Sequence, residues 1–233
     1  MPKLVITELT PKFPDFRVAL IVLEDLTLAP IRSPVLESEI AAAETRCRER
    51  WSGVELSAIP GVAAWRTAYR GFGVKKTSYR SSVERLIKRV LAGEALPSVN
   101  ALVDAYNAVS IDSGLCLGCD DHDRVDGDLA FRFARPGDTF VDMAEGGDTL
   151  DPPKDGEVVY ADAAHVLCRR WNWRQDARSL VTPATRRAVL TAQSNGVGDV
   201  EAAAWRVVEI AARECGGRGR VVIADANAPI REF

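Results

Sequence analysis

The sequence predicts a single mixed α+β domain in which helices pack on a mixed sheet. Apolar residues repeat mostly at helical spacing as far as Val109, whereas short apolar runs alternate with Gly, Pro and Asp turns from Leu115 onward. Helices followed by strands favour an α+β arrangement over regular βαβ alternation. The chain has 233 residues with 47% hydrophobic content and no internal repeat, which suits one core. We expect one domain over residues 1–233, with its core at about 30–190 and a helix and strand from 195–225 packed on it.

The N-terminal part predicts one strand and two helices. Residues 16–23 form an apolar run too short for a helix, which indicates a buried strand. Ser33 followed by Pro34 is typical of a helix start, because Ser is a good N-cap and Pro fits the first helical position. An apolar stripe at helical spacing continues from there through Leu36, Ile40, Ala43, Cys47 and Trp51. A second, short helix is predicted over residues 57–68.

A third helix is predicted within the stretch 69–91. Ser81 and Glu84 have the spacing of a capping box, and Gly93 marks the end of the helix. The apolar residues of this segment repeat at helical spacing: Val83, Leu86, Ile87, Val90 and Leu91. One face of the helix is therefore expected to pack on the core.

The loop before this helix has the composition of an anion-binding site. A helix N-terminus presents free N–H groups and the positive end of the helix dipole, which favour a phosphate or carboxylate. The loop adds cations and hydroxyls at that point: Lys75, Lys76, Thr77, Ser78 and Arg80. The alternative is a flexible basic loop beside a solvated helix, because charge runs usually lie at the surface.

A fourth helix is predicted over residues 99–109, with Ser98 as its N-cap. Asn100, Asp104 and Asn107 fall at i, i+4 and i+7, so they form one polar stripe. That stripe is either a solvent face or one wall of a pocket. Leu102, Val103 and Tyr106 are expected to face the core.

The remaining segments predict short strands and one more helix. Strands are expected at 129–134, 139–143, 156–161 and 166–170, each bounded by turn residues. Asp199 is expected to cap a helix that runs through Cys215 and ends at the Gly216–Gly217 pair. A last strand or extended segment follows at 221–224.

Tryptophans and arginines interleave in the segment 169–174. If 166–170 is a strand that continues, alternation carries Trp171 and Trp173 to one face, and Arg170, Asn172 and Arg174 to the other. Cations beside flat aromatic surface suit single-stranded nucleic acid, which requires phosphate neutralisation and base stacking. The alternative is two core tryptophans with arginines paired to the acid-rich segment 112–162.

Soft metal ligands occur at five positions: Cys116, Cys119, His122, His165 and Cys168. Cysteines separated by two residues are typical of zinc sites. Two cysteines that act as small hydrophobic residues in a turn would give the same spacing. We expect no metal and no cofactor. The chain also lacks a Gly-x-Ser-x-Gly elbow, a Walker A loop and a Gly-x-Gly-x-x-Gly fingerprint. With only two histidines, a Ser or Cys nucleophile served by a triad is not expected.

Cellular context follows from what the sequence lacks. It contains no run near 20 apolar residues and no signal-peptide layout at its N-terminus. Its five cysteines are an odd number without a disulfide-framework spacing. We expect a cytoplasmic protein with no membrane partner.

Four segments together resemble a known family. They are 69–84 (YRGFGVKKTSYRSSVE), 96–107 (LPSVNALVDAYN), 156–162 (GEVVYAD) and 168–174 (CRRWNWR). In this order they resemble the tRNA-editing domain of the phenylalanyl-tRNA synthetase beta subunit, its third and fourth B modules, and more closely the freestanding bacterial relatives of that domain. The resemblance covers roughly residues 30–190. One departure is the segment 116–120, where relatives carry a Pro-x-Gly-Gly-type turn that forms part of the amino-acid pocket.

The resemblance implies a mixed α/β fold with a pocket for an amino acid esterified to the 3′ end of tRNA. It also implies hydrolysis of misacylated tRNA in trans, with tRNA as partner and possible association with a synthetase. Asn107, Asp104 and Glu157 are the expected catalytic residues, which bind the α-amino group or position water. The expected substrate- and tRNA-binding set is Arg70, Lys75, Lys76, Thr77, Ser78, Arg80, Asn100, Asp120, Asp162, Arg169, Arg170, Asn172 and Arg174. Two alternatives stay open: a binding module without catalysis, and a metal-dependent enzyme.

Overall fold

The computed structural model describes residues 1–75, 78–142 and 150–233. Within these ranges the fold class is mixed α+β, as the sequence predicts. The strands and helices follow in the order β1 (Lys3–Val5), β2 (Phe16–Glu24), α1 (Pro34–Trp51), α2 (Pro60–Gly71), α3 (Ser82–Leu91), α4 (Ala101–Ser113), β3 (Cys116–Asp121), β4 (Leu129–Phe133), β5 (Val158–Ala161), β6 (Val166–Arg169), β7 (Arg174–Gln175), β8 (Ala188–Asn195), α5 (Val200–Cys215), β9 (Arg218–Ala224) and β10 (Ile230–Glu232).

The strands form two sheets. One has the order β3-β8-β2-β9 and is antiparallel throughout. The other has the order β10-β1-β4-β5-β6-β7, and its β1–β4 pair is parallel. Because β2 and β8 are central strands, their apolar residues are almost completely buried.

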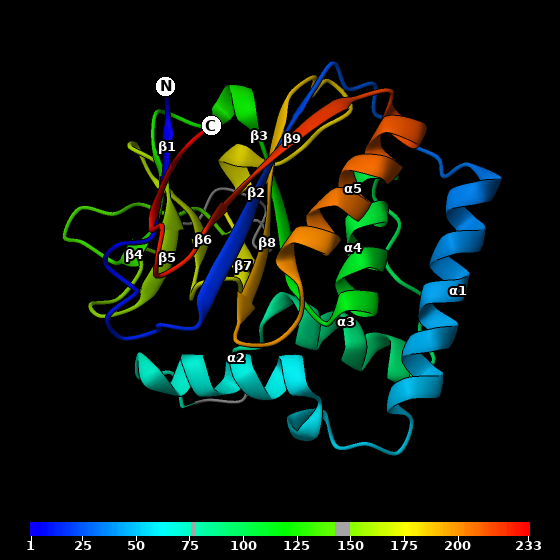
Figure 1. The fold of residues 1–233 in the computed structure, drawn as a ribbon, viewed down its shortest axis with the longest axis horizontal. Coiled ribbons are helices and arrows are strands. Elements are labelled where there is room, and N and C mark those ends of the chain that lie inside the picture. The colour runs from blue at the N-terminus through cyan, green and yellow to red at the C-terminus, as the bar shows by residue number, and fades with distance from the viewer. Residues whose placement is uncertain (76–77, 143–149) are drawn as a thin grey trace.

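The helices lie to one side of the four-stranded sheet and below it (Figure 1). α4 and α5 pack against this sheet and against each other, and α1 packs on the outer side of α4. α3 contacts β3, and α2 contacts β8. The six-stranded sheet lies on the opposite side of the molecule from α1 (Figure 1). None of the described helices is long and apolar enough to cross a membrane.

Several helix starts are confirmed by their caps. The Ser33 hydroxyl accepts from the Leu36 N–H at 3.1 Å and begins α1. Ser81 caps α3 in the same way, accepting from the Glu84 N–H at 3.4 Å. The Asp199 side chain accepts from the first-turn N–H groups of α5. Each cap satisfies N–H donors that the helix itself leaves without a partner.

The predicted cap of α4 is wrong by two residues. Asn100 is the N-cap, because its side-chain oxygen accepts from the Val103 N–H at 3.0 Å. The Ser98 hydroxyl instead donates to Asp104 at 3.4 Å. All three members of the polar stripe, Asn100, Asp104 and Asn107, are buried, so this stripe is not a solvent face.

The two sheets contain five strands that were not predicted from the sequence, namely β1, β3, β7, β8 and β10, and the strand predicted at 139–143 does not form over its described residues. Residues 116–120 belong to strand β3 and do not form a turn. β8 lies in the middle of the four-stranded sheet. The segment 139–142 forms only isolated bridges, one of them between Val141 and Leu150. Met143 lies outside the described residues.

The alternation predicted for the two tryptophans is also wrong. β6 ends at Arg169, and the next two residues have positive φ angles, 46° at Arg170 and 69° at Trp171. The chain therefore leaves the strand before Trp173, and the two rings separate. Trp171 is fully buried and packs edge-on against aromatic rings of the core: Phe13, Phe16 and Trp65.

Candidate functional site

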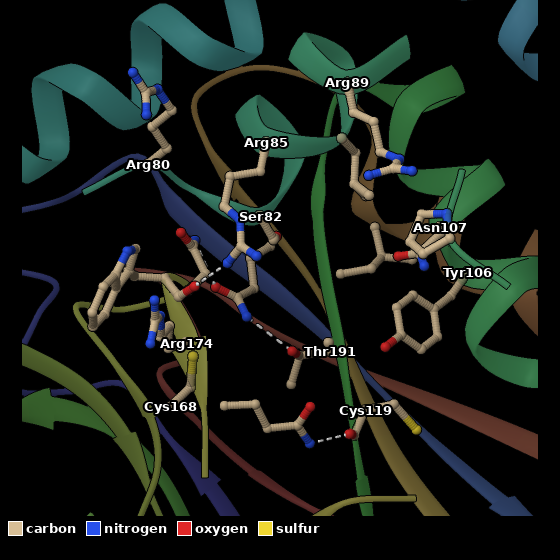
Figure 2. A pocket seen from close by; sticks show the side chains of 18 of the residues that line it. Arg80, Ser82, Arg85, Arg89, Tyr106, Asn107, Cys119, Cys168, Arg174 and Thr191 are labelled. Carbon is tan, nitrogen blue, oxygen red and sulfur yellow. Dashed lines mark hydrogen bonds between the residues drawn. The ribbon is translucent and has the colours of Figure 1, made fainter. Parts of the chain in front are cut away.

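A cavity of about 760 Å³ opens between the two sheets near α3 and α4 (Figure 2). Its walls come from β3 and β8 of one sheet, from β6 and the segment 172–175, and from α3 and α4. This volume falls in the range of small-molecule sites, about 300–1,000 Å³. Its lining combines basic, neutral polar and apolar side chains.

The strand register determines which side chains of the four-stranded sheet face the cavity. Gly118 on β3 pairs with Thr191 on β8, and Cys116 pairs with Gln193. Residues directly opposite each other in an antiparallel pair share one face. The polar residues Thr191 and Gln193 therefore face the cavity beside Gly118, where a Cβ would meet no atom within 4 Å.

The face of the four-stranded sheet toward the cavity forms its floor. A chain of hydrogen bonds connects neutral polar groups at this floor. The Tyr69 hydroxyl donates to the Asn172 side-chain oxygen at 2.9 Å. The Asn172 amide donates to Gln193 at 3.1 Å, and the Gln193 amide donates to the Thr191 hydroxyl at 2.9 Å (Figure 2). Because each member is buried and bonded, the chain holds these side chains in fixed orientations.

Asp120 provides a carboxyl group at the end of this floor. Its Oδ1 accepts from the Ser179 hydroxyl at 2.6 Å and from the Gln175 amide at 2.8 Å. Burial raises the pKa of Asp120 to about 7, against the lowering effect of these two hydrogen bonds. The negative charges of Asp176 and Asp162 add to the increase.

The mouth of the cavity is basic. Arg85, Lys88 and Arg89 lie at i, i+3 and i+4 on α3, so they share its exposed face. Arg85 donates to the Trp173 carbonyl at 3.1 Å, and Arg89 forms an ion pair with Glu94 at 3.0 Å. The side chains of Arg85 and Arg89 extend from α3 into the space among the lining residues (Figure 2).

Buried thiols line the same region but are poor nucleophiles. Burial raises the pKa of Cys116 to about 11 and also raises the pKa values of Cys119 and Cys168 well above the usual thiol range. The thiolate is the nucleophilic form, so these groups stay protonated near neutral pH. Cys116 and Cys119 are three residues apart on β3 and point to opposite faces. In the described part of the chain, no group of three or more His, Cys, Asp or Glu is arranged to hold a metal ion.

Five of the residues expected in the site line this cavity: Arg80, Asn107, Asp120, Asn172 and Arg174. They come from four separate segments of the chain and meet only in the fold. Arg80 pairs with Glu84 at 3.3 Å, and Arg174 pairs with Asp142. The Asn107 side chain extends from α4 toward the cavity (Figure 2).

The two carboxylates expected to act beside Asn107 lie outside the lining. Asp104 accepts from Arg32 at 2.7 Å and from the Val99 N–H at 2.9 Å, and it is 1% exposed. Glu157 accepts two hydrogen bonds from Arg169, both at 2.9 Å. Each carboxylate thus fixes neighbouring segments of the chain and is not directed at the cavity.

The other buried residues of the expected set also hold the structure. Asn100 caps α4, and Asp162 accepts from the N–H groups of the turn that follows it. Arg169 is fully buried against Glu157. The Arg170 guanidinium packs over the Tyr79 ring at 3.9 Å and over the Trp173 ring at 4.3 Å. Burial lowers the pKa of Arg170.

The basic loop is only partly described. Lys75 is exposed and lines a smaller cavity of about 100 Å³ beside Glu84. Ser78 is exposed, and Arg70 at the end of α2 contacts the Thr67 hydroxyl at 3.0 Å. Lys76 and Thr77 lie outside the described residues.

Sequence reasoning missed several lining groups. Tyr160, Gln175, Thr191 and Gln193 lie on strands whose polar positions carry no recognisable motif. Arg85, Lys88 and Arg89 were visible as a basic run, and their helical spacing was the signal that would have placed them on one face.

A family model described as the B3/4 domain matches residues 64–203. This range includes every residue that lines the 760 Å³ cavity. One similar solved structure is an N-terminal fragment of the phenylalanyl-tRNA synthetase beta subunit from Pyrococcus horikoshii, at 13% identity and a TM-score of 0.46. The match covers 93% of this chain and 50% of that chain. No curated protein matches the sequence. Because the family model matches more than half of the chain, this protein belongs to the B3/4 domain family.

Proposed function

We propose that this protein is an aminoacyl-tRNA deacylase that hydrolyses the ester of misacylated tRNA in trans. The observation that carries the proposal is the polarity of the cavity, which has cations at its mouth and mainly neutral polar groups inside. A nucleotide that carries an aminoacyl ester has the matching polarity, with phosphates at one end and a compact polar group at the other. Membership of the B3/4 domain family and the resemblance of four sequence segments to editing domains support the same substrate.

The cations at the mouth are assigned to the tRNA backbone. Arg85 and Lys88 lie on the exposed face of α3, and Arg80 and Arg174 lie beside them in the lining. Lys75, which is exposed at the smaller cavity beside Glu84, is proposed as a further phosphate contact. Lysine and arginine neutralise phosphates and release counterions, which makes such binding strongly dependent on salt.

We assign the role of nucleophile to a water molecule and not to a protein side chain. The buried thiols remain protonated, and no histidine lines the cavity in the described part of the chain. The ester is already activated, so placing the water and stabilising the oxyanion accounts for much of the rate. Asn107 is the amide proposed to contact the ester or the water. A ribose hydroxyl next to the ester is the proposed acceptor for the proton of that water.

Asp104 and Glu157 are proposed to act through other residues. Asp104 ties the start of α4 to Arg32 and thereby places Asn107. Glu157 accepts from the Arg170 N–H at 3.1 Å and from Arg169, which anchors the turn that carries Asn172. Both are positioning residues in this assignment.

The test is release of labelled amino acid from a panel of misacylated tRNAs at catalytic protein concentrations. We expect multiple turnovers on one or a few members of the panel. Asn107→Ala should lower kcat by about 10²-fold, as expected for loss of one donor to an oxyanion. Full activity of this variant would remove Asn107 from the site.

A binding module without catalysis is the second candidate. The absence of histidine from the described lining favours it, since histidine is the commonest general base. Saturable tRNA binding with no release on any member of the panel would establish this candidate and end the first. An association with a synthetase fits either function, and co-purification with the synthetase from native extract would test it.

A further inference from the structure

We propose that Asp120 binds the α-ammonium group of the aminoacyl ester, so that the cavity selects substrates with a free α-amine. The inference rests on the proposed function, because it names the group of the substrate that the interior recognises. It does not depend on which amino acid is removed.

Asp120 differs from the other buried acids in its partners. In the described part of the chain, every other buried carboxylate has an Arg or His nitrogen within 4.0 Å: Glu44, Glu84, Asp104, Asp121, Asp142, Glu157, Asp162 and Asp176. For Asp120 no such ion pair exists among the described residues, although it is only 4% exposed. Among the described residues, Asp120 is therefore the buried carboxylate that has neither an arginine nor a histidine beside it.

The groups that surround Asp120 cannot provide that counter-ion. Its two hydrogen-bond donors, Ser179 and Gln175, are neutral. The titratable groups with the largest electrostatic interactions with it include acids, phenols and thiols: Asp162, Asp176, Tyr106, Tyr160, Cys119 and Cys168. A buried carboxylate among such groups is costly unless a cation is added.

A second buried polar group of the same cavity also lacks a partner among the described residues. Tyr160 lines the cavity, and its buried hydroxyl has no hydrogen-bond partner among the described residues. Tyr160 is 2% exposed and stacks on Phe131 at 4.6 Å, so its position is fixed by packing. Asp120 and Tyr160 line the same cavity, and burial followed by the charge of Asp120 raises the pKa of Tyr160. A ligand with polar hydrogens fits between a carboxylate and an unpaired hydroxyl.

An α-ammonium group has the charge and position that this site requires. It lies one carbon from the ester carbonyl, so fixing it against Asp120 also fixes the carbonyl relative to the lining amides. The other carboxyl group in the lining, Glu94, is exposed at the mouth and already paired with Arg89. Phosphates at the basic mouth and an ammonium at Asp120 give the substrate one favourable orientation.

The experiment compares two ligands of equal size by calorimetry with the full chain. The probes are 3′-deoxy-3′-(alanylamino)adenosine, an amide that resists hydrolysis, and its lactyl counterpart, in which a hydroxyl replaces the amine. We expect the wild type to bind the alanyl probe about 10- to 100-fold more tightly, as for a charge-assisted hydrogen bond. Asp120→Asn should remove this preference, mostly by lowering the affinity for the alanyl probe. Glu94→Gln, at the mouth, should retain it.

Other outcomes overturn the assignment. Equal affinity of the wild type for the two probes, no binding of either, or a preference that survives in Asp120→Asn would each do so. A 6-amino-2-hydroxyhexanoyl probe that binds as tightly as the alanyl probe, and only when Asp120 is present, would show that a side-chain amine is the ligand instead. If the protein turns over the ester but shows no preference for the amine, the deacylase proposal holds and the role of Asp120 is wrong. If it prefers the amine but shows no turnover, the role of Asp120 holds and the deacylase proposal is wrong.

Discussion

At the scale of single residues, buried carboxylates in this protein serve two different purposes. Asp104 and Glu157 are saturated by arginine and backbone donors, which makes them structural anchors. Within the described ranges, Asp120 accepts hydrogen bonds from neutral side chains only, and it lines a cavity. Residue type and spacing in the sequence cannot separate these cases, because the distinction depends on which arginine the fold brings alongside. Asn107 and Asp120 could therefore be predicted as polar candidates, whereas the lining residues Thr191 and Gln193 could not.

Glu157→Ala should destabilise the protein strongly. It leaves the Arg169 guanidinium, which is fully buried, with one carboxylate partner fewer, and losing one member of a buried pair costs about 3–5 kcal/mol. Thermal unfolding should show the loss, and Glu209→Ala on the surface of α5 should leave the midpoint nearly unchanged. If Glu157 instead contacted the substrate, Glu157→Gln would abolish turnover at temperatures where the variant is fully folded.

Asp120→Asn should stabilise the ligand-free protein, and the gain should depend on pH. Folding raises the pKa of this carboxyl to about 7, so the folded state holds its proton over a pH range where the unfolded state has lost it. The favourable contribution of the protonated group is complete at acid pH and is lost as pH rises through about 7. The free energy of unfolding of the variant should therefore exceed that of the wild type most at pH 8, by on the order of 4 kcal/mol for the full pKa shift. At pH 4 the difference should be small. Equal gains in unfolding free energy at both pH values would contradict this explanation.

At the scale of elements, helices followed their local signals more closely than strands did. Ser33, Ser81 and Asp199 cap helices where the sequence predicted them, because a cap depends only on residues within one turn. β8 was missed, since its face toward the cavity carries Thr191 and Gln193 where a core strand usually carries apolar residues. The strand predicted to continue past Arg169 ends at two residues with positive φ, which no pattern in the segment indicates.

The exposed face of α3 should contribute to tRNA affinity and not to chemistry. Replacing Arg85 and Lys88 by Ala should raise KM for aminoacyl-tRNA while kcat stays near that of the wild type. The slope of log affinity against log salt should fall by about one per phosphate contact removed. Arg218→Ala with Arg220→Ala is the matched control, because these residues lie on β9 at the opposite edge of the sheet from β3. An unchanged salt slope in the α3 variant would exclude this face from the RNA contact.

At the scale of the whole molecule, the cavity exists only because distant segments meet. Its lining extends from Arg80 to Gln193 and combines two helices with strands of both sheets. Composition and helical spacing predicted the mixed α+β class, but the pairing of β3 with β8 is a non-local feature. The resemblance in four segments predicted a relationship to this family, and the family match over residues 64–203 confirms it.

The most direct test of the deacylase proposal is to fill this cavity and measure deacylation. Gly118 has room for a side chain, since a Cβ there meets no atom within 4 Å, so Gly118→Leu should occupy the floor without unfolding the protein. Ala212→Leu on the exposed side of α5 adds the same atoms elsewhere. We predict multiple turnovers on misacylated tRNA for the wild type and for Ala212→Leu, and a loss of at least about 10²-fold for a folded Gly118→Leu. Wild-type turnover by Gly118→Leu, or no turnover by the wild type on any misacylated tRNA, would contradict the proposal that this cavity is the hydrolytic site.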